Sequence, residues 1–511
     1  MPLINSIVAW LNTKRLHQIE LFKKYPFEVQ EEALLKILQA ASDTEWGKKY
    51  DYKSINTIDL FQERVPLLSY EKIMPFVNRL RKGEKDIFWP GEIKWFAKTS
   101  GTASDRSKFI PVSKEALEEC HFRGVKDALA IYTSNFPETK IFTGKALTLG
   151  GSHRINNYSN QSYYGDLSAI LIENIPFWAN FLRTPHNKIA LLDEWEEKLE
   201  KITEATIVEN VTNLAGVPSW NLVMIKYILK RTGKKNLLEI WPNLELFIHG
   251  GVNFTPYRKQ FEKLIPSEKM NYMETYNASE GFFGIQDDLS CDDMLLMLDY
   301  GVFYEFIPME EFNNKNPKIL TVADVEKNKN YAIIISTNGG LWRYVIGDTV
   351  IFTSLYPHKF KISGRTTHFI NAFGEEVIID NALKALEITC NKTGAQISEF
   401  TAAPIYMDIE KKGKHEWLIE FETDPENLEY FISVLDNALI SLNSDYEAKR
   451  YKNITLDKPI IRKMEPGVFY NWFNNKKKLG GQNKIPRLSN ERKYVEELLV
   501  INEQIKQGKQ P

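Results

Sequence analysis

The spacing of apolar and polar positions predicts a helical start to the chain. One apolar stripe in the first 50 residues recurs every three or four positions: Val29, Ala33, Leu34, Ile37 and Leu38. Charged residues fill the positions between, which is typical of a helix with one buried face. The same period predicts helices over residues 113–133, 193–209 and 218–232, with Pro218 in a first turn and Gly233 at a C-terminal stop.

Short apolar runs become frequent after residue 243 and predict a block rich in strands. The runs cover residues 244–249, 272–275, 294–298, 303–307, 331–337 and 341–346. By contrast, the polar and irregular stretch 152–166 is predicted to be a loop without regular structure. Because strands and helices alternate before this block, the fold class expected for residues 1–365 is α/β with β-rich subdomains.

A second, smaller unit is predicted after residue 365. Its pattern reads as helix, two strands, helix and a last strand: residues 377–387, 400–409, 416–422, 428–442 and 454–462. Two or three strands with packed helices make a small α+β domain. The expected domains are therefore residues 1–365, large and N-terminal, and residues 366–511, small and C-terminal.

Composition narrows the function classes. The chain has 511 residues and a net charge of −2, so there is no electrostatic case for nucleic acid or an anionic membrane as the main partner. No apolar run approaches the roughly 20 residues of a membrane span. The three cysteines are scattered, which favours neither disulfides nor a zinc site, and Cys120 is interpreted as a small core residue. The expected compartment is the cytoplasm.

The stretch with the clearest chemistry is a turn rich in hydroxyl groups. Thr99, Ser100, Gly101 and Thr102 lie between two apolar runs, with Lys108 six positions later. Such a turn can direct N–H and O–H groups at one anion, and the lysine adds a positive charge. The spacing is not that of a Walker A loop. Phosphate binding and an ordinary polar hairpin both remain open on this motif alone.

Further polar residues follow predicted strands downstream. In the segment from Glu274 to Gln286, Tyr276 could stack on a flat base and Glu280 could hold Mg²⁺. Asp348 follows a glycine at the end of an apolar run, where a carboxylate commonly accepts ribose hydroxyls, or caps the strand as an Asx turn. Arg365 opens the passage between the domains, and Lys484 lies near the C-terminus.

Taken together, these stretches resemble the auxin-responsive acyl acid amido synthetases, a family within the adenylate-forming superfamily. Thr99 to Thr102 with Lys108 match the family's first motif, and Tyr276, Ser279 and Glu280 match its second. Two further motifs are matched by these residues: Arg343, Tyr344, Gly347, Asp348, Lys484, Pro486 and Arg487. The resemblance spans nearly the whole chain. The first loop departs from it by having Ala103-Ser104-Asp105 where many relatives carry more glycines.

The resemblance implies a large adenylate-forming domain, a small C-terminal domain, and a site for ATP and Mg²⁺. It assigns catalysis to Lys484, Ser100, Thr102 and Lys108, and the metal to Glu280. It assigns nucleotide binding to Thr99, Ser100, Gly101, Thr102, Tyr276, Asn277, Ser279, Asp348 and Arg365. The small domain would rotate about residues 364–367 between two half-reactions.

The reaction implied is ATP-dependent ligation of a small carboxylic acid to an amino acid through an acyl-adenylate. The resemblance favours a monomer and leaves the acid and the amino acid open. Acyl-CoA ligation is the alternative within enzymes, and a nucleotide-binding protein without ligase activity is the alternative outside them.

Overall fold

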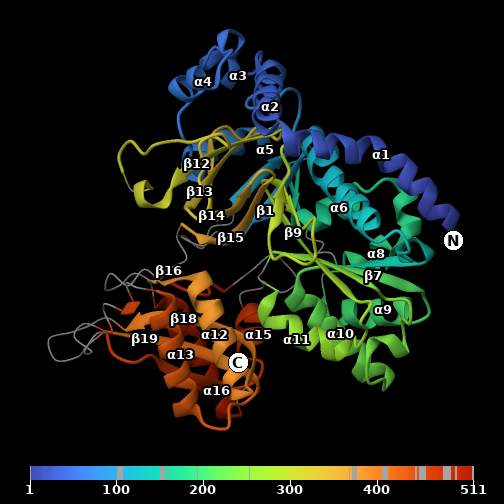
Figure 1. Ribbon diagram of the computed structural model, residues 1–511, viewed down its shortest axis with the longest axis vertical. Coiled ribbons are helices and arrows are strands. Elements are labelled where there is room, and N and C mark those ends of the chain that lie inside the picture. Colours follow the sequence, from blue (N-terminus) through green and yellow to red (C-terminus); the bar gives the residue numbers. More distant parts are fainter. Residues whose placement is uncertain are drawn as a thin grey trace.

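The computed structural model contains a large N-terminal part and a smaller C-terminal part, which lie side by side (Figure 1). It describes residues 2–99, 108–149, 156–159, 162–192, 194–251, 254–312, 314–366, 369–370, 377–405, 413–443, 446–447, 450, 456–475, 485–489 and 492–508. The expected mixture of helices and strands, with a large first domain and a smaller second one, is confirmed.

Eleven α-helices cover the described portion of the N-terminal part. They are α1 (Pro2–Lys24), α2 (Pro26–Ala41), α3 (Glu45–Lys49), α4 (Ile58–Arg64), α5 (Tyr70–Arg81), α6 (Phe122–Asn135), α7 (Leu167–Glu173), α8 (Asn187–Ala190), α9 (Trp195–Thr206), α10 (Pro218–Thr232) and α11 (Thr255–Leu264). The apolar stripe predicted in the first 50 residues buries Leu34, Ile37 and Leu38 on α2. Gly233 ends α10 with a φ of +68°, the left-handed stop expected from its sequence.

An eleven-stranded sheet forms the centre of the N-terminal part. Its order is β12 (Val302–Pro308), β13 (Asn330–Thr337), β14 (Tyr344–Leu355), β15 (His358–Arg365), β11 (Met294–Leu296), β10 (Gly281–Ile285), β9 (Asn271–Ala278), β8 (Leu246–Gly250), β7 (Val211–Gly216), β3 (Lys145–Thr148) and β6 (Arg183–Thr184). Strands β6, β3, β7, β8 and β9 run parallel, and the remaining neighbours are antiparallel. The parallel half of the sheet therefore borders the antiparallel half between β9 and β10.

A smaller sheet carries the flanks of the hydroxyl-rich turn. Its order is β2 (Lys108–Val112), β1 (Trp95–Thr99), β5 (Ser162–Gly165) and β4 (Asn156–Ser159). The two strands predicted on either side of the turn are thus present. The loop predicted over residues 152–166 is wrong in part, because β4 and β5 lie within it. Backbone pairing of β5 with β1 forms this strand without an alternating apolar pattern.

The C-terminal part is built on a three-stranded sheet with helices packed on it. The strands are β18 (Gln396–Ile405), β19 (Lys414–Thr423) and β20 (Ile460–Met464), and the short strands β16 (Phe369–Ile370) and β17 (Val377–Ile378) pair before them. The helices are α12 (Ile379–Thr393), α13 (Leu428–Leu442), α15 (Val468–Asn475) and α16 (Lys493–Lys506). This is the expected small α+β unit.

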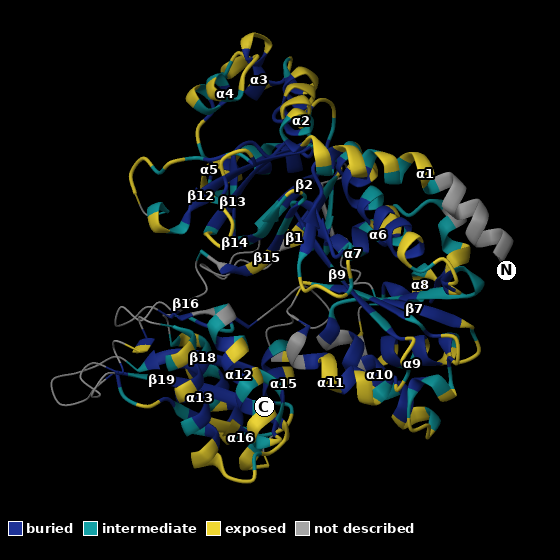
Figure 2. Cartoon of the chain, viewed as in Figure 1, coloured by how far each residue is buried: buried dark blue, intermediate teal, exposed yellow. Residues whose placement is uncertain are grey.

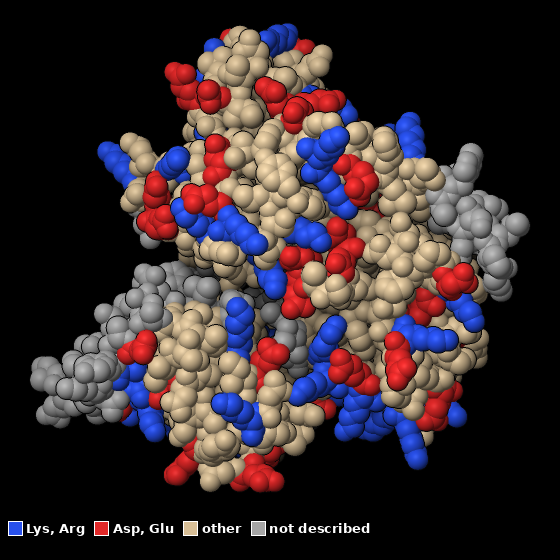
Figure 3. All heavy atoms as spheres, in the orientation of Figure 1, with Lys and Arg blue, Asp and Glu red and all other residues tan. Residues whose placement is uncertain are grey.

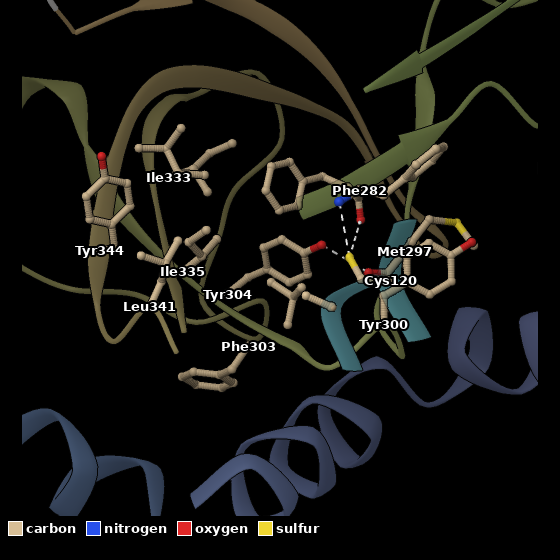
Figure 4. Packing of buried hydrophobic residues seen from close by; sticks show 14 of the residues in the cluster. Cys120, Phe282, Met297, Tyr300, Phe303, Tyr304, Ile333, Ile335, Leu341 and Tyr344 are labelled. Atoms are coloured by element: carbon tan, nitrogen blue, oxygen red, sulfur yellow. Dashed lines mark hydrogen bonds between the residues drawn. The ribbon is translucent and has the colours of Figure 1, made fainter. Parts of the chain in front are cut away.

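Buried residues concentrate between the sheets and their helices, while the helix faces toward solvent are exposed (Figure 2). Figure 4 shows one part of the core, where Cys120 meets the backbone of Phe282. The Phe282 N–H donates to the Cys120 sulfur at 3.2 Å, and burial raises the pKa of the thiol to about 12. Cys120 is therefore the unreactive core residue that the sequence predicted.

Charged side chains of both signs are interspersed over the face shown in Figure 3. This distribution agrees with the net charge of −2. None of the helices in the described ranges combines the length and the apolar character that crossing a membrane requires.

Candidate functional site

Tyr276 and Asp348 come together although 72 positions separate them. The Tyr276 hydroxyl donates a hydrogen bond to Asp348 Oδ2, and both side chains are buried. On the neighbouring strand Arg365 lies directly opposite Asp348 in the β14–β15 register. Three of the residues assigned to nucleotide binding, from β9, β14 and β15, thus lie at one place in the sheet.

The local backbone explains how Asp348 reaches this position. The sequence placed it at the end of a strand over residues 341–346, whereas β14 begins at Tyr344 and continues through Asp348 to Leu355. Gly347 has a φ of +92°, a conformation that side-chain-bearing residues rarely adopt. The N–H of Thr366 donates to the Gly347 carbonyl at 2.7 Å, so the chain leaving β15 is held against this glycine.

Aromatic rings fix the orientation of Tyr276. Its ring centroid lies 5.0 Å from that of Phe283 and 6.1 Å from that of Phe360. Only 6% of Tyr276 is exposed. The phenol is therefore held by packing, and its hydroxyl orients the Asp348 carboxylate.

The turn from β9 to β10 contains Ser279 and Glu280, and Asn277 lies near the end of β9. The Asn277 Oδ1 lies 3.0 Å from Nδ1 of His121, which belongs to a π-helix over Ala116–His121. Burial lowers the pKa of His121 to about 4, so the ring is neutral near pH 7. The sequence did not single out His121, because nothing in its own neighbourhood signals a partner 156 positions away.

Ser279 and Glu280 are the residues of this turn that could bind a phosphate and a metal ion. Ser279 is buried, and its hydroxyl has no hydrogen-bond partner among the residues that the structure describes. Glu280 follows directly and is partly exposed. One carboxylate beside an available hydroxyl suits Mg²⁺, which takes most of its ligands from phosphates and water. Within the described ranges no three acidic, histidine or cysteine side chains gather into a metal cluster.

The ends of the hydroxyl-rich turn are held by the β1–β2 hairpin, in which Thr99 pairs with Lys108. Ser100, Gly101 and Thr102 lie outside the described residues, as does Lys484. The Lys108 ammonium lies 5.7 Å from the ring of Tyr70 on α5. The helix that follows β2 contains His121, so the chain runs from this hairpin to the residue that contacts Asn277.

Arg343, a residue of the third motif, lies elsewhere. Its guanidinium makes two hydrogen bonds to the Glu305 carboxylate, at 2.9 and 2.8 Å. Both side chains are buried. The motif therefore divides, with Asp348 at the candidate site and Arg343 in the core.

Comparisons with known proteins identify the family of this chain. Family models described as the GH3 family N-terminal, central and C-terminal domains match residues 15–270, 295–365 and 380–493. The indole-3-acetic acid-amido synthetase GH3.3 of Arabidopsis thaliana is 23% identical, with 90% of this chain and 88% of that protein covered.

Two solved structures share the fold. The AtGH3.15 acyl acid amido synthetase in complex with 2,4-DB has a TM-score of 0.78 at 18% identity, covering 93% of each chain. A 2-hydroxyisobutyryl-CoA ligase in the postadenylation state has a TM-score of 0.58 at 12% identity, covering 94% of this chain and 91% of that one. The architecture is that of the adenylate-forming ligases, and the chain belongs to the GH3 family.

Proposed function

We propose that this member of the GH3 family is an ATP-dependent acyl acid amido synthetase. It would convert a small carboxylic acid to an acyl-adenylate and then pass the acyl group to the amine of an amino acid. The observation that carries the proposal is the Tyr276–Asp348 hydrogen bond, which unites two motifs of the nucleotide site with Arg365 opposite.

The first half-reaction requires positioning and charge neutralisation. A carboxylate is a poor electrophile, and transfer of AMP to it releases pyrophosphate. Asp348 would accept the ribose hydroxyls, in the orientation that Tyr276 imposes. The Ser279 hydroxyl and the turn over Thr99 to Thr102 would bind phosphates, with Lys108 and Lys484 supplying positive charge.

Magnesium fits the donors of the β9–β10 turn. Glu280 would hold the ion, and the ion would neutralise phosphate charge when bound. Asn277 is held by His121 at 3.0 Å, so the turn between Tyr276 and Glu280 has a fixed base.

The second half-reaction requires an unprotonated amine. Nucleophilic attack on the acyl-adenylate gives the amide and AMP. Because only the neutral amine attacks, we expect the transfer rate to rise between about pH 7 and pH 9. Exclusion of water protects the adenylate from hydrolysis at this stage.

One backbone contact supports the proposed domain boundary between residues 365 and 366. Thr366 makes the last described backbone contact to β14, at the Gly347 carbonyl. Residues 364–367 would act as the hinge about which the C-terminal domain moves between the half-reactions.

An adenylation screen tests the proposal. The full-length protein is incubated with ATP, Mg²⁺, labelled pyrophosphate and single acids, among them indole-3-acetate, 2,4-DB and 2-hydroxyisobutyrate. We expect acid-dependent exchange of pyrophosphate into ATP, followed by amide formation when amino acids are added. ATP binding without exchange across the panel would contradict the proposal and favour a nucleotide-binding protein without ligase activity.

Acyl-CoA ligation is the second candidate, favoured by the shared fold of the 2-hydroxyisobutyryl-CoA ligase. The two reactions share adenylation and differ in the acceptor. Mass spectrometry of parallel reactions with CoA or with amino acids separates them, since one gives a thioester and the other an amide.

A further inference from the structure

The C-terminal domain contacts helix α11 through a partly buried hydrogen bond. Nη2 of Arg487 donates to the Tyr257 hydroxyl at 3.2 Å. The same guanidinium donates to the Phe400 carbonyl at 2.8 Å and to the Glu399 carboxylate. It also lies over the Phe400 ring, 4.9 Å from the centroid. Arg487 is therefore fixed within its own domain and directed at the other.

On the N-terminal side of this contact, Tyr257 belongs to a helix that follows the central sheet strand β8. It occupies the first turn of α11, which follows β8, and only 5% of it is exposed. Burial raises the pKa of its phenol, so the hydroxyl stays neutral and accepts from Arg487. Gly250, at the end of β8, pairs with Thr275, the residue before Tyr276. The helix that carries Tyr257 therefore follows a strand that pairs with β9, the strand of Tyr276.

Three further hydrogen bonds hold the segment that carries Arg487 against β18. The N–H of Ala402 donates to the Arg487 carbonyl at 2.9 Å, and the N–H of Ser489 donates to the Ala402 carbonyl at 3.1 Å. The Thr401 hydroxyl donates to the Pro486 carbonyl at 2.6 Å. Lys484 precedes Arg487 by three residues, a span of at most about 11 Å. Fixing Arg487 against α11 therefore fixes the described segment 485–489, which follows Lys484 in the sequence.

Two other described contacts join the same surfaces, and both lie nearer to solvent. Lys226 of α10 donates to Glu422 of β19 at 2.8 Å, and Lys259 of α11 donates to Asn391 of α12. Their exposure leaves them weak individually. Figure 1 shows α11 beside the C-terminal part. The Arg487–Tyr257 bond is less exposed than these two, because Tyr257 itself is buried, so it is the contact that we expect to select one docking of the domain.

We propose that Tyr257 is a positioning residue whose hydroxyl holds Arg487, and with it the chain that follows Lys484, in the docking that supports adenylation. This inference rests on the proposed ligase function. It predicts that loss of the hydroxyl affects the two half-reactions unequally, because a domain released from this docking reaches the arrangement for amide transfer at least as readily.

The kinetic test is Tyr257→Phe in the full-length protein. Pyrophosphate exchange is measured with the fastest acid among indole-3-acetate, 2,4-DB and 2-hydroxyisobutyrate, and amide transfer is measured from the synthetic acyl-adenylate of that acid. We expect exchange to fall about tenfold, the effect of losing one hydrogen bond to a charged group. We expect transfer to remain within about twofold. Arg487→Lys keeps the charge, loses the planar fork and should shift the ratio in the same direction.

Tyr272→Phe is the matched control. Tyr272 packs against Phe254 below α11, and its buried hydroxyl has no hydrogen-bond partner among the described residues. Removing that hydroxyl should leave the ratio of the two rates unchanged. An equal loss of both rates in Tyr257→Phe, or no change in either, would overturn the proposal.

A cross-linking measurement tests the docking without any acid. Lys226→Cys and Glu422→Cys, combined with Cys291→Ser to remove an exposed native thiol, place two reactive groups across the interface. We expect Tyr257→Phe to slow cross-linking by a short bifunctional reagent at least fivefold, and an unchanged rate would refute the docking role. If no acid supports exchange in the unmodified protein, the ligase proposal fails, and cross-linking still decides whether Tyr257 holds the domain.

Discussion

Two polar pairs at the start of β14 use similar chemistry for different purposes. Arg343 and Asp348 are five residues apart in one motif. Arg343 makes a bidentate pair with Glu305 and donates to the carbonyls of Gln62 and Val65, at 2.8 and 2.7 Å. Asp348 instead receives its hydrogen bond from the neutral phenol of Tyr276.

The difference lies in what each arrangement leaves for a ligand. The Arg343 guanidinium is enclosed, and it joins the chain after α4 to the central sheet. Gln62 adds a further hydrogen bond to Glu305 at 2.9 Å. The Tyr276 phenol is a neutral donor and cancels none of the Asp348 charge, and a carboxylate with two oxygens can accept from ribose hydroxyls as well. We infer that Arg343 stabilises the fold and that Asp348 serves the site.

The largest expected effect comes from breaking the enclosed pair. Arg343→Met leaves the Glu305 carboxylate buried without its cation, and such a loss costs about 3–5 kcal/mol of stability. Thermal unfolding of the full-length protein should show a melting temperature lower by several degrees. The double variant Arg343→Met, Glu305→Gln should recover part of this loss, because it removes the buried charge.

An exposed pair provides the control for this prediction. Arg79 bridges Glu45 at 2.7 Å and Glu84 at 2.8 Å on the surface. Arg79→Met should cost less than about 1 kcal/mol. If Arg343→Met melts no lower than Arg79→Met, the structural role assigned to Arg343 is wrong.

The second effect concerns activity. Asp348→Asn keeps the shape of the side chain and removes its charge, so we expect kcat/KM for ATP to fall about 10- to 100-fold. Tyr276→Phe removes only the orienting hydroxyl and should cost about 3- to 10-fold. Initial rates of pyrophosphate exchange at varied ATP measure both.

Melting temperatures separate this prediction from the first. Both variants should melt within about 2 °C of the unmodified protein when no ligand is present. Normal exchange kinetics in Asp348→Asn would contradict the ribose-binding role, whatever the melting temperature showed.

The sequence predicted the family and the fold class. Both are confirmed, because motifs in a fixed order identify a chain even where each motif alone is ambiguous. The roles assigned to the individual site residues, from Thr99 to Lys484, stay predictions.

The sequence could not predict the burial and the distant partners of individual side chains. Strand β7 was missed because Thr212 and Asn213 look polar, yet both are buried, and Thr212 bonds to the Ile141 carbonyl at 2.7 Å. Arg343 and Asp348 share one motif, and only the positions of Glu305 and Tyr276 separate their roles. Partners that lie 38 and 72 positions away leave no local signal.

A third carboxylate extends the comparison, because within the described residues neither a guanidinium nor a phenol donates to it. Glu274 lies two residues before Tyr276 on β9, on the same face of the strand. Its carboxylate has no hydrogen-bond partner within the described residues. Burial and the nearby Asp292 raise its pKa to about 7, against the opposing charge of Lys361.

The raised pKa of Glu274 gives the smallest predicted effect. Between about pH 4.5 and pH 7 the folded protein retains a proton that the unfolded chain releases, so stability falls as pH rises through this window. Glu274→Gln carries no such charge and should be more stable than the parent at pH 8, by on the order of 1 kcal/mol for a partly exposed group, with little difference at pH 4.5. Thermal unfolding of both proteins at the two pH values measures this.

Asp292→Asn, which removes only the neighbouring repulsion, should give a smaller gain. A stability difference that is the same at both pH values would mean that Glu274 is already ionised at pH 4.5. That result would contradict the raised pKa.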